Sequence, residues 1–415
     1  MTDAAPAPVF GLNPFEPSFF EDPYSQYAVL REGDPVHKTQ FGAWVITRWD
    51  DVHALLRRPG MSVDDRNING PGRREQLALL APDREARRSL AILNIDPPDH
   101  TRIRRLVSRA FTPRAVEQIR ARVGELVDEI LDDLATREGP IDLVSELAFP
   151  LPFSVISEML GMPEGDRDQL RTWSHTVTQI LDPVLAMTNT EAIFDAIDHM
   201  DEVVADAIAW KRGRPDDDDL LQAMIRADDD GDMLSDEELL ANVVLLYLAG
   251  HETTVNLIGN GVCALLAHRD QLERLVADPT LDEEAVEELL RYDSPVQFSR
   301  RIALDDFEFM GAHISAGEMV MTCLGAANRD PRKFGDDADD LDLSRVTARE
   351  HVSFGSGVHH CLGAALARLE GQEVIGRLVR RFPDLELAGE AKLNGRIVLR
   401  GRDEIPLQLD PHRAN

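Results

Sequence analysis

Apolar residues recur every three or four positions along most of the chain, a spacing that predicts a mainly α-helical protein. Pro113 has a position typical of a helix start and divides the first long helical segment into two helices. The segment 142–212 is interrupted near Pro150, at GMPEG and at DPVLAMTNT, so we expect three helices there. The helical segments predicted in this way are 101–137, 142–212, 282–292 and 362–382.

A further helix, from Ser235 to about residue 268, is predicted to be unusually long. Ser235 and Glu238 have the spacing of a capping box, in which each side chain accepts a hydrogen bond from the backbone of the other residue. The apolar run from Leu239 to Gly250 within it is shorter than the ~20 residues that cross a bilayer. We therefore expect a buried helix of a soluble protein.

The pattern changes to alternation after Pro295, where VQFSRRIAL, FEFMGAHI and EMVMTCL predict strands joined by the turns MGAH and SAGE. Weaker strands are predicted at 385–389, 396–399 and 405–409. Neither a repeat nor a linker-like stretch divides the chain. We expect one domain over residues 1–415, mainly α with a minor β region, in which residues 1–13 are flexible.

Composition narrows the class of protein. A net charge of −31 argues against a nucleic-acid partner, because a phosphate backbone would be repelled. Three cysteines cannot form a disulfide framework, and their odd number fits a reducing compartment. The amino-terminal residues resemble neither a signal peptide nor a membrane anchor. We expect a cytoplasmic monomer that does not bind membranes.

One segment reverses this acidic balance. Between His100 and Arg122 the chain carries seven arginines and a single acid, Glu117. A basic face on an acidic protein predicts a docking surface for an acidic partner. A helix that merely happens to be basic is an equally good reading of the same residues.

The stretch FGSGVHHCLG, from Phe354 to Gly363, places a cysteine between two glycines and a helix. Cys361 stands at the predicted helix start, where unpaired N–H groups and the helix dipole lower a thiol pKa and favour the metal-binding thiolate. Packing of a small buried residue is the simplest alternative. A zinc site lacks a second ligand pair, and a cysteine nucleophile needs a base that the sequence does not place.

A second polar interruption is AGHETT, from Ala249 to Thr254, within the long helix. Ala249 and Gly250 are small enough to leave a gap on one helix face, and Gly250 can loosen the helix. Glu252 and Thr253 can form an acid–alcohol proton relay. The same residues also fit a helix that turns polar where it reaches solvent.

The cysteine stretch resembles the haem-binding loop of the cytochrome P450 haem-thiolate monooxygenases. The spacing Phe-Gly-x-Gly-x-His-x-Cys-x-Gly is matched at all six fixed positions, Phe354, Gly355, Gly357, His359, Cys361 and Gly363. AGHETT resembles the oxygen-activation motif of the same family. The resemblance implies a triangular α-rich prism whose long central helix lies over haem b.

The resemblance also implies roles for these residues. Cys361 would be the axial thiolate ligand of the haem iron, and Phe354 would pack beside its sulfur. The acid and alcohol of oxygen activation would be Glu252 and Thr253, rather than Thr254. The haem would further be held by Ala249, Gly250, Gly355 and Gly363, and its propionates by His100, Arg104, Arg301 and His359.

A structural element of the family is implied by EELLRY, in which Glu288 and Arg291 lie three apart on one helix face. Its third member would be an arginine of the following irregular loop, and we expect Arg345 in that role. Leu341 and Leu343 stand where the family often has an aromatic residue and a proline.

The implied activity is hydroxylation or epoxidation of an apolar organic substrate with O2 and electrons from NAD(P)H. An acidic ferredoxin, reduced by a ferredoxin reductase, would deliver the electrons to the arginine-rich segment 102–114. A peroxide-using or isomerising haem-thiolate enzyme and a haem-binding sensor without turnover are the alternatives. We expect residues 61–95 and 165–200 to form a variable lid over a pocket lined by Leu93, Leu246, Ala249, Val296 and Phe298.

Overall fold

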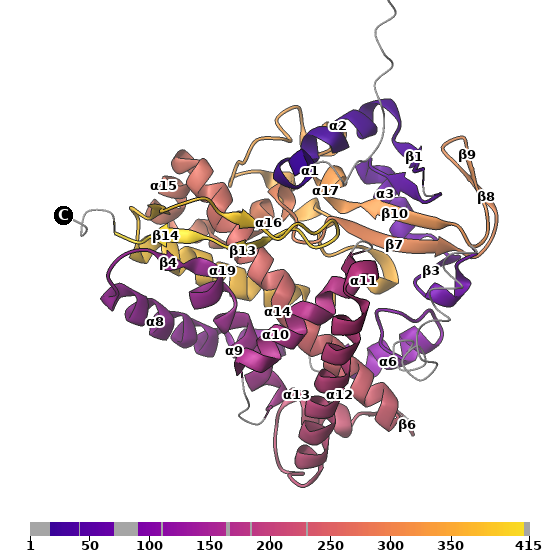
Figure 1. The fold of residues 1–415 in the computed structure, drawn as a ribbon, viewed down its shortest axis with the longest axis horizontal. Coiled ribbons are helices and arrows are strands. Elements are labelled where there is room, and N and C mark those ends of the chain that lie inside the picture. The colour runs from indigo at the N-terminus through magenta and orange to yellow at the C-terminus, as the bar shows by residue number, and fades with distance from the viewer. Residues whose placement is uncertain are drawn as a thin grey trace, which may run out of the picture.

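The computed structural model describes residues 17–40, 42–69, 90–108, 111–162, 167–182, 185–229 and 231–410. The predicted flexible stretch at residues 1–13 lies outside these ranges. Helices dominate, and the molecule has a roughly triangular outline with α12 and α13 at one apex (Figure 1). The expected fold class, mainly α with a minor β region, is confirmed.

The helix α14, Asp236–Ala267, runs through the middle of the molecule (Figure 1). Ser235 caps it, and both hydrogen bonds of the predicted capping box with Glu238 are present. Helices α9, α12, α16 and α19 pack against it, and 19 of its residues are buried. Because α14 is apolar on nearly every side, it forms the centre of the main hydrophobic core.

The helices within 101–137, 142–212, 282–292 and 362–382 agree with the predicted segments to within a few residues, whereas α2, α3 and α15 were not predicted. Pro113 and Pro150 both occupy first-turn positions, where the missing N–H of proline costs nothing, so Pro150 begins a helix instead of interrupting one. The bounds of the longer helices are α2 Pro23–Gly33, α3 Trp49–Arg57, α6 Asp99–Ser108, α7 Pro113–Gln118, α8 Arg120–Thr136, α9 Pro150–Leu160, α10 Arg167–Thr178, α12 Thr190–Arg212, α13 Leu220–Ile225, α15 Arg269–Ala277, α16 Asp282–Tyr292 and α19 Ala364–Arg381.

A five-stranded sheet in the order β1-β2-β10-β7-β3 flanks the helices. Its central pair, β7 and β10, is antiparallel, with Arg301 opposite Val320. The strands β1 and β2 have only three residues each, too short for a period-two pattern to reveal. The sheet strands are β1 Val36–Lys38, β2 Trp44–Ile46, β3 Met61–Ser62, β7 Phe298–Ala303 and β10 Met319–Cys323.

Shorter strands complete the β region: β8 Phe307–Phe309 pairs with β9 Ala312–Ile314, and β11 Glu386–Leu387, β14 Pro406–Gln408 and β4 Ile141–Asp142 form a three-stranded sheet. The prediction of a strand at 396–399 is wrong. Apart from a single bridge between Leu399 and Val296, this segment is a loop. Its pairing with residues 295–297 is limited to the hydrogen bonds beside this bridge, and the N–H of Ile397 donates to the side chain of Asp182 instead.

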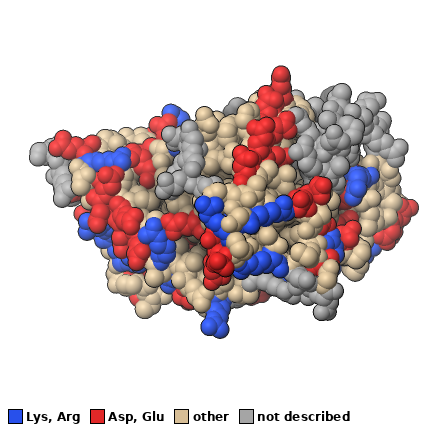
Figure 2. Space-filling model, turned by 90° about the horizontal axis from the view of Figure 1, so that it is seen from below, with Lys and Arg blue, Asp and Glu red and all other residues tan. Residues whose placement is uncertain are grey.

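Charged side chains are distributed over the surface in both signs. On the face shown in Figure 2, basic and acidic side chains are interspersed and several clusters of opposite sign adjoin. Within the described ranges, none of the helices carries an apolar stretch sufficient to span a bilayer.

Candidate active site

The cysteine loop is shaped by its glycines. Gly355 and Gly357 have φ values of 68° and 73°, in the left-handed region that favours glycine. A Cβ atom at Gly357 would lie 2.5 Å from the carbonyl oxygen of Leu56, so a side chain has no space there. The N–H of Cys361 donates to the carbonyl of Phe354 at 2.9 Å, which closes the loop just before α19 begins.

Cys361 is exposed, although neighbouring protein atoms partly desolvate its thiol. This desolvation raises its pKa, although the N–H of Gly363 and the guanidinium groups of Arg104 and Arg368 act in the opposite direction. The expectation that the helix start alone lowers the thiol pKa is therefore wrong, because desolvation outweighs it. A thiolate at this position needs a further positive charge, such as that of a metal ion bound to the sulfur.

Two residues of the loop present a flat apolar surface beside the sulfur. Phe354 packs on the cluster of Leu257, Val286 and Leu290, and the guanidinium of Arg368 lies 4.5 Å from its ring centre. At Gly363 a Cβ atom would meet nothing within 4 Å, so the helix start is open on that side. A planar ligand can approach the backbone there.

Four side chains that carry N–H donors, two histidines and two arginines, converge at this loop. His100 is buried, neither ring nitrogen has a hydrogen-bond partner among the described residues, and its ring centre lies 4.2 Å from that of His359. Burial lowers the pKa of His100 to about 4 and that of His359 to about 3, so both are neutral N–H donors at pH 7. Arg104 donates to the carbonyl of His360 at 2.7 Å.

Arg301 is buried in β7, and its Nη1 atom donates to Ser299 and to a backbone carbonyl. Neighbouring Arg300 points to the other face of the strand and pairs with Asp65. Among the described residues, neither Arg301 nor Arg104 forms an ion pair with a carboxylate. Orphaned histidine nitrogens and unpaired guanidinium groups fit the two carboxylates of a haem, and the open face at Gly363 fits its ring.

Helix α14 presents one accessible stripe. Ala249 is exposed, and Leu245, Leu248 and Thr253 are half-buried, at spacings of three and four that place them on one face. Leu246 was predicted to line the pocket, but it is 7% exposed and belongs to the main core. Where nearly all residues of a helix are apolar, the sequence does not show which of them face the core. Leu245 and Leu248 lie on the accessible stripe, where Leu246 was expected.

Gly250 was predicted to leave a gap for the cofactor, and this is also corrected. A Cβ atom at Gly250 would lie 3.1 Å from the side chain of Ile156, so the glycine allows α9 to approach α14. The exposed neighbour Ala249 faces away from that contact.

Glu252 and Thr253, the acid–alcohol pair of α14, differ in their exposure to solvent. Thr253 is half-buried, and its hydroxyl donates to the carbonyl of Ala249 at 3.1 Å. Glu252 is buried, and its carboxylate accepts from Arg396 at 3.1 Å, with a ring nitrogen of His175 at 3.8 Å. Burial raises the pKa of Glu252, and Arg396 opposes that shift. Sequence reasoning gave no role to Arg396, which lies 144 residues away along the chain.

A sequence profile of the family described as Cytochrome P450 matches residues 64–279 and 277–394. The chain belongs to the cytochrome P450 family. Its members bind haem b and use O2 with electrons from NAD(P)H, so this cytochrome P450 is an oxidoreductase of the monooxygenase class.

Individual relatives match over almost their whole length. Cytochrome P450 107B1 of Saccharopolyspora erythraea is 42% identical over 409 residues, covering 95% of this chain and 96% of the relative. Vitamin D(3) 25-hydroxylase of Pseudonocardia autotrophica is 42% identical over 407 residues, covering 96% and 97%. The structure of epothilone D-bound cytochrome P450epoK has a TM-score of 0.90 at 30% identity and covers 97% of this chain and 100% of that chain.

Besides Ala249, two of the expected pocket residues of this cytochrome P450 are accessible. Leu93 is 46% exposed, next to buried Ile92, and Val296 is half-buried. Phe298 is only 4% exposed and packs edge-on against Tyr27 in a separate core, so it does not line the pocket. Phe298 and Arg301 are three positions apart in β7, and successive strand residues alternate faces, so they point in opposite directions.

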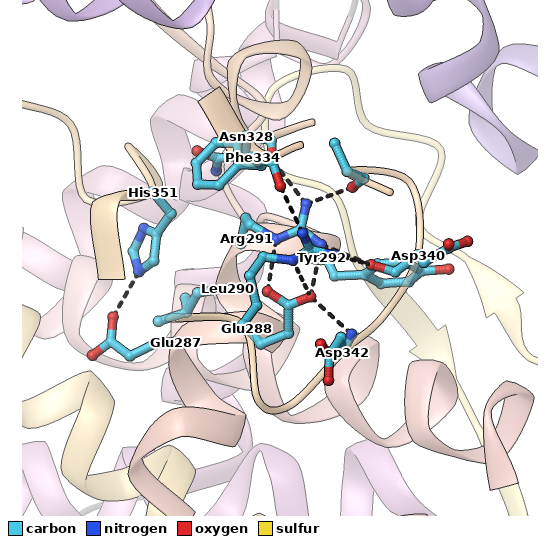
Figure 3. A network of polar contacts seen from close by, with 12 residues as sticks. Glu287, Glu288, Leu290, Arg291, Tyr292, Asn328, Phe334, Asp340, Asp342 and His351 are labelled. Carbon is cyan, nitrogen blue, oxygen red and sulfur yellow. Dashed lines mark hydrogen bonds and ion pairs between the residues drawn. The ribbon is translucent and has the colours of Figure 1, made fainter. Parts of the chain in front are cut away.

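The predicted arginine–carboxylate element forms a network of polar contacts between α16 and the irregular loop (Figure 3). Glu288 and Arg291 are fully buried and share two hydrogen bonds of 2.7 Å. Arg345 reaches the same carboxylate at 3.2 Å. Arg291 also donates to the carbonyls of Asn328, Ala338 and Asp340, so this pair fixes the irregular loop on α16.

The family's usual aromatic residue and proline are replaced in this loop by leucines. Leu341 and Leu343 are 4% and 0% exposed, and both belong to the main hydrophobic core. The substitution therefore exchanges one kind of apolar filling for another and leaves Arg345 on the carboxylate.

A buried acid that sequence reasoning missed is Glu370 of α19. Within the described part of the chain neither carboxyl oxygen has a hydrogen bond of ordinary geometry, and burial raises the pKa to about 8, which the nearby Thr254 hydroxyl opposes only in part. Glu370 is therefore protonated at neutral pH. A helix of alternating polar and apolar residues gives no sign of this, because the burial comes from α14.

This buried acid predicts a pH-dependent stability. Between the ordinary glutamate pKa of 4.5 and about 8, folded protein keeps a proton that the unfolded chain has lost. Each pH unit in that window therefore favours unfolding about tenfold through Glu370 alone. Glu370→Gln should flatten the fall in stability from pH 5 to pH 8, measured by denaturant unfolding. The control Glu373→Gln, on the same helix, should keep it; an unchanged slope in Glu370→Gln would contradict the assignment.

Proposed function

We propose that the Cys361 thiolate would bind the iron of haem b, and that the remaining site residues would hold the haem around it. Arg104, Arg301 and the N–H groups of His100 and His359 would bind its propionates. Phe354, Gly355 and Gly363 would support the ring beside the sulfur. When bound in this way, haem b supplies O2 activation and transfer of one oxygen atom to the substrate.

On the opposite wall, we propose that Thr253 and Glu252 hold and pass the protons that O–O cleavage needs. Thr253 lies on the accessible stripe, and its hydroxyl can rotate from the Ala249 carbonyl to a water or ligand in the site. Glu252 is an ionisable group one residue away, within the buried interior.

The substrate that the site fits best is a bulky apolar molecule of the steroid or macrocycle class, which is hydroxylated or epoxidised. The observation that carries this proposal is the accessible stripe Leu245, Leu248 and Ala249, which offers no charged group. Leu93 and Val296 add further apolar surface. Two similar proteins are named for molecules of this kind, vitamin D(3) and epothilone D.

A spectral titration tests the proposal. Purified haem-loaded protein is titrated with vitamin D3, a macrolactone and a C16 fatty acid, and the Soret band is followed as the iron-bound water is displaced. We expect the secosteroid or the macrolactone to bind more tightly than the fatty acid and to give an oxygenated product. Leu248→Arg should weaken both by tenfold or more, whereas the buried-core control Leu246→Met should not. Preference for the fatty acid would contradict the substrate class.

For electron supply, we propose an acidic ferredoxin with its reductase, docking on the described part of the arginine-rich segment. Three arginines of this segment form ion pairs, which lowers its net positive charge: Arg102 pairs with Glu238, Arg120 with Glu373 and Arg122 with Glu158. These acids come from other parts of the chain, so the sequence of the segment alone did not predict the ion pairs. Arg105 and Arg114 are exposed, and Arg104 of the same helix reaches the cysteine loop. Arg109 lies outside the described residues.

Charge reversal at this surface should slow reduction. Arg105→Glu combined with Arg114→Glu is expected to reduce the rate of electron transfer from an acidic ferredoxin at least tenfold at low salt and to weaken its salt dependence. Stopped-flow reduction under carbon monoxide measures the rate. Arg214→Glu, exposed after α12, is the matched control and should leave the rate unchanged. Equal rates in the double variant and the control would refute the docking site.

We further propose a cytoplasmic location and a monomeric state. The three cysteines are all unpaired, which fits a reducing compartment.

A further inference from the structure

The carboxylate of Glu252 lies where three parts of the chain meet. Glu252 belongs to α14, His175 to α10, and Arg396 to the loop 394–399 near the carboxyl end. The Nη1 atom of Arg396 donates to Glu252 at 3.1 Å, and the ring of His175 is 3.8 Å from the same oxygen. No motif of the sequence connects these residues.

Arg396 is held rigidly in this position. It is 5% exposed, and Nη1 also donates to the hydroxyl of Thr178 at 2.9 Å. Nη2 lies 2.9 Å from a ring nitrogen of His175. Next to it, the N–H of Ile397 donates to Asp182 at 2.7 Å, so the loop is bonded to the end of the α10 segment at several points. Arg396 therefore reaches Glu252 only while this segment is packed on α14.

Arg396 is also the cation that directly bonds Glu252. His175 is neutral at pH 7, because burial and the charges of Arg396 and Arg171 lower its pKa to about 4. Arg171 acts on Glu252 from a greater distance, and Asp403 opposes both arginines. Among the groups that face Glu252, Arg396 therefore has the largest effect in favour of the ionised carboxylate.

We propose that Arg396 is a positioning residue for the oxygenation reaction: it orients the Glu252 carboxylate and couples that orientation to closure of the α10 segment. The inference rests on the proposed role of Glu252 as a proton-transfer group. The inference requires that one guanidinium group, that of Arg396, holds both the Glu252 carboxylate and the α10 segment that packs over it. Loosening α10 would then change the protonation of Glu252, and changing Arg396 would loosen α10.

The test compares Arg396→Met, which keeps length without charge, with Arg396→Lys and with Arg402→Met. Arg402 follows the same loop and bonds Asn260 instead of Glu252, so it is a matched control. Infrared spectroscopy follows the protonated carboxyl band that is lost in Glu252→Gln, and hydrogen exchange follows residues 171–182. We expect Arg396→Met to raise the pH at which the band appears by about 1–3 units. Faster exchange in 171–182 should accompany it.

The second readout is the coupling efficiency, the amount of product formed per NAD(P)H consumed. Arg396→Met should lower it several-fold with a shifted pH profile, Arg396→Lys should restore most of it, and Arg402→Met should have no effect. The double variant with Glu252→Gln should be no worse than Glu252→Gln alone, because both changes remove one function. Thr178→Val, which deletes only a hydroxyl bonded to Arg396, should shift the band less in the same direction if Arg396→Met does not fold.

An unchanged band or unchanged exchange in Arg396→Met would overturn the inference, and so would additive losses in the double variant. Failure of the underlying proposal looks different. If Glu252→Gln couples normally while Arg396→Met still shifts the band and exchange, Glu252 is not the proton-transfer group. If Glu252→Gln uncouples the reaction while the band in Arg396→Met does not move, Arg396 is not its positioning residue.

Discussion

Replacing Glu288 with alanine is expected to lower the free energy of unfolding by about 3–5 kcal/mol and to reduce haem incorporation severely. The variant would leave Arg291 and Arg345 buried, at 0% and 9% exposure, without the carboxylate that both bond. The loop carrying Asn328 and Asp340 would lose its anchor, and the cysteine loop follows directly along the chain. Denaturant unfolding and the ratio of haem to protein absorbance measure the two effects.

The matched control is Glu284→Ala on the same helix. Glu284 is an exposed acid whose contact with Arg349 is 3.3 Å, and exposed pairs of this kind contribute less than about 1 kcal/mol. Similar losses in the two variants would mean that the buried network of Figure 3 does not stabilise the fold in the way its geometry indicates.

The second large effect is expected from Thr253→Ala. Removing the hydroxyl should leave substrate binding intact but reduce product per NAD(P)H about tenfold or more, with the missing electrons appearing as hydrogen peroxide. General acid–base groups contribute factors of this size or larger. Parallel assays of NAD(P)H consumption, peroxide and product make the comparison.

Thr254→Ala is the control, because Thr254 is 1% exposed and contacts Glu370 instead of the accessible stripe. It should retain coupling, although the deletion of a buried hydroxyl can lower stability. Full coupling in Thr253→Ala would contradict the proton-transfer role, unless a hydroxyl of the substrate takes its place; a second substrate without that hydroxyl resolves this.

Local sequence rules predicted much of the fold because the decisive signals are local. Ser235 and Glu238 form their capping box within four residues, and Pro113 begins a helix as its fixed φ favours. The tight turns of the cysteine loop could be predicted for the same reason, because glycine is the residue that most readily adopts a positive φ angle.

Other features depend on parts of the chain that the sequence does not connect. The loop around Arg396 has β-forming residues, yet the side chains of Asp182 and Asn394 bond the backbone N–H groups of Ile397 and Arg396, and only a single bridge to Val296 forms. The pKa of Cys361 was predicted from the helix start, whereas burial by distant elements dominates it. Leu246 and Leu245 are indistinguishable in an apolar run, and only the packing of α14 places one inside and one on the accessible stripe.

The ligation of Cys361 is the claim on which the site depends, and one spectrum tests it. Purified protein is reduced and saturated with carbon monoxide, and the Soret band is recorded for wild type and for Cys361→Ala. We predict the strongly red-shifted band of a thiolate-ligated haem in wild type and its loss in the variant. A wild-type band at the position of an imidazole-ligated haem, or a red-shifted band that persists in Cys361→Ala, would contradict the account.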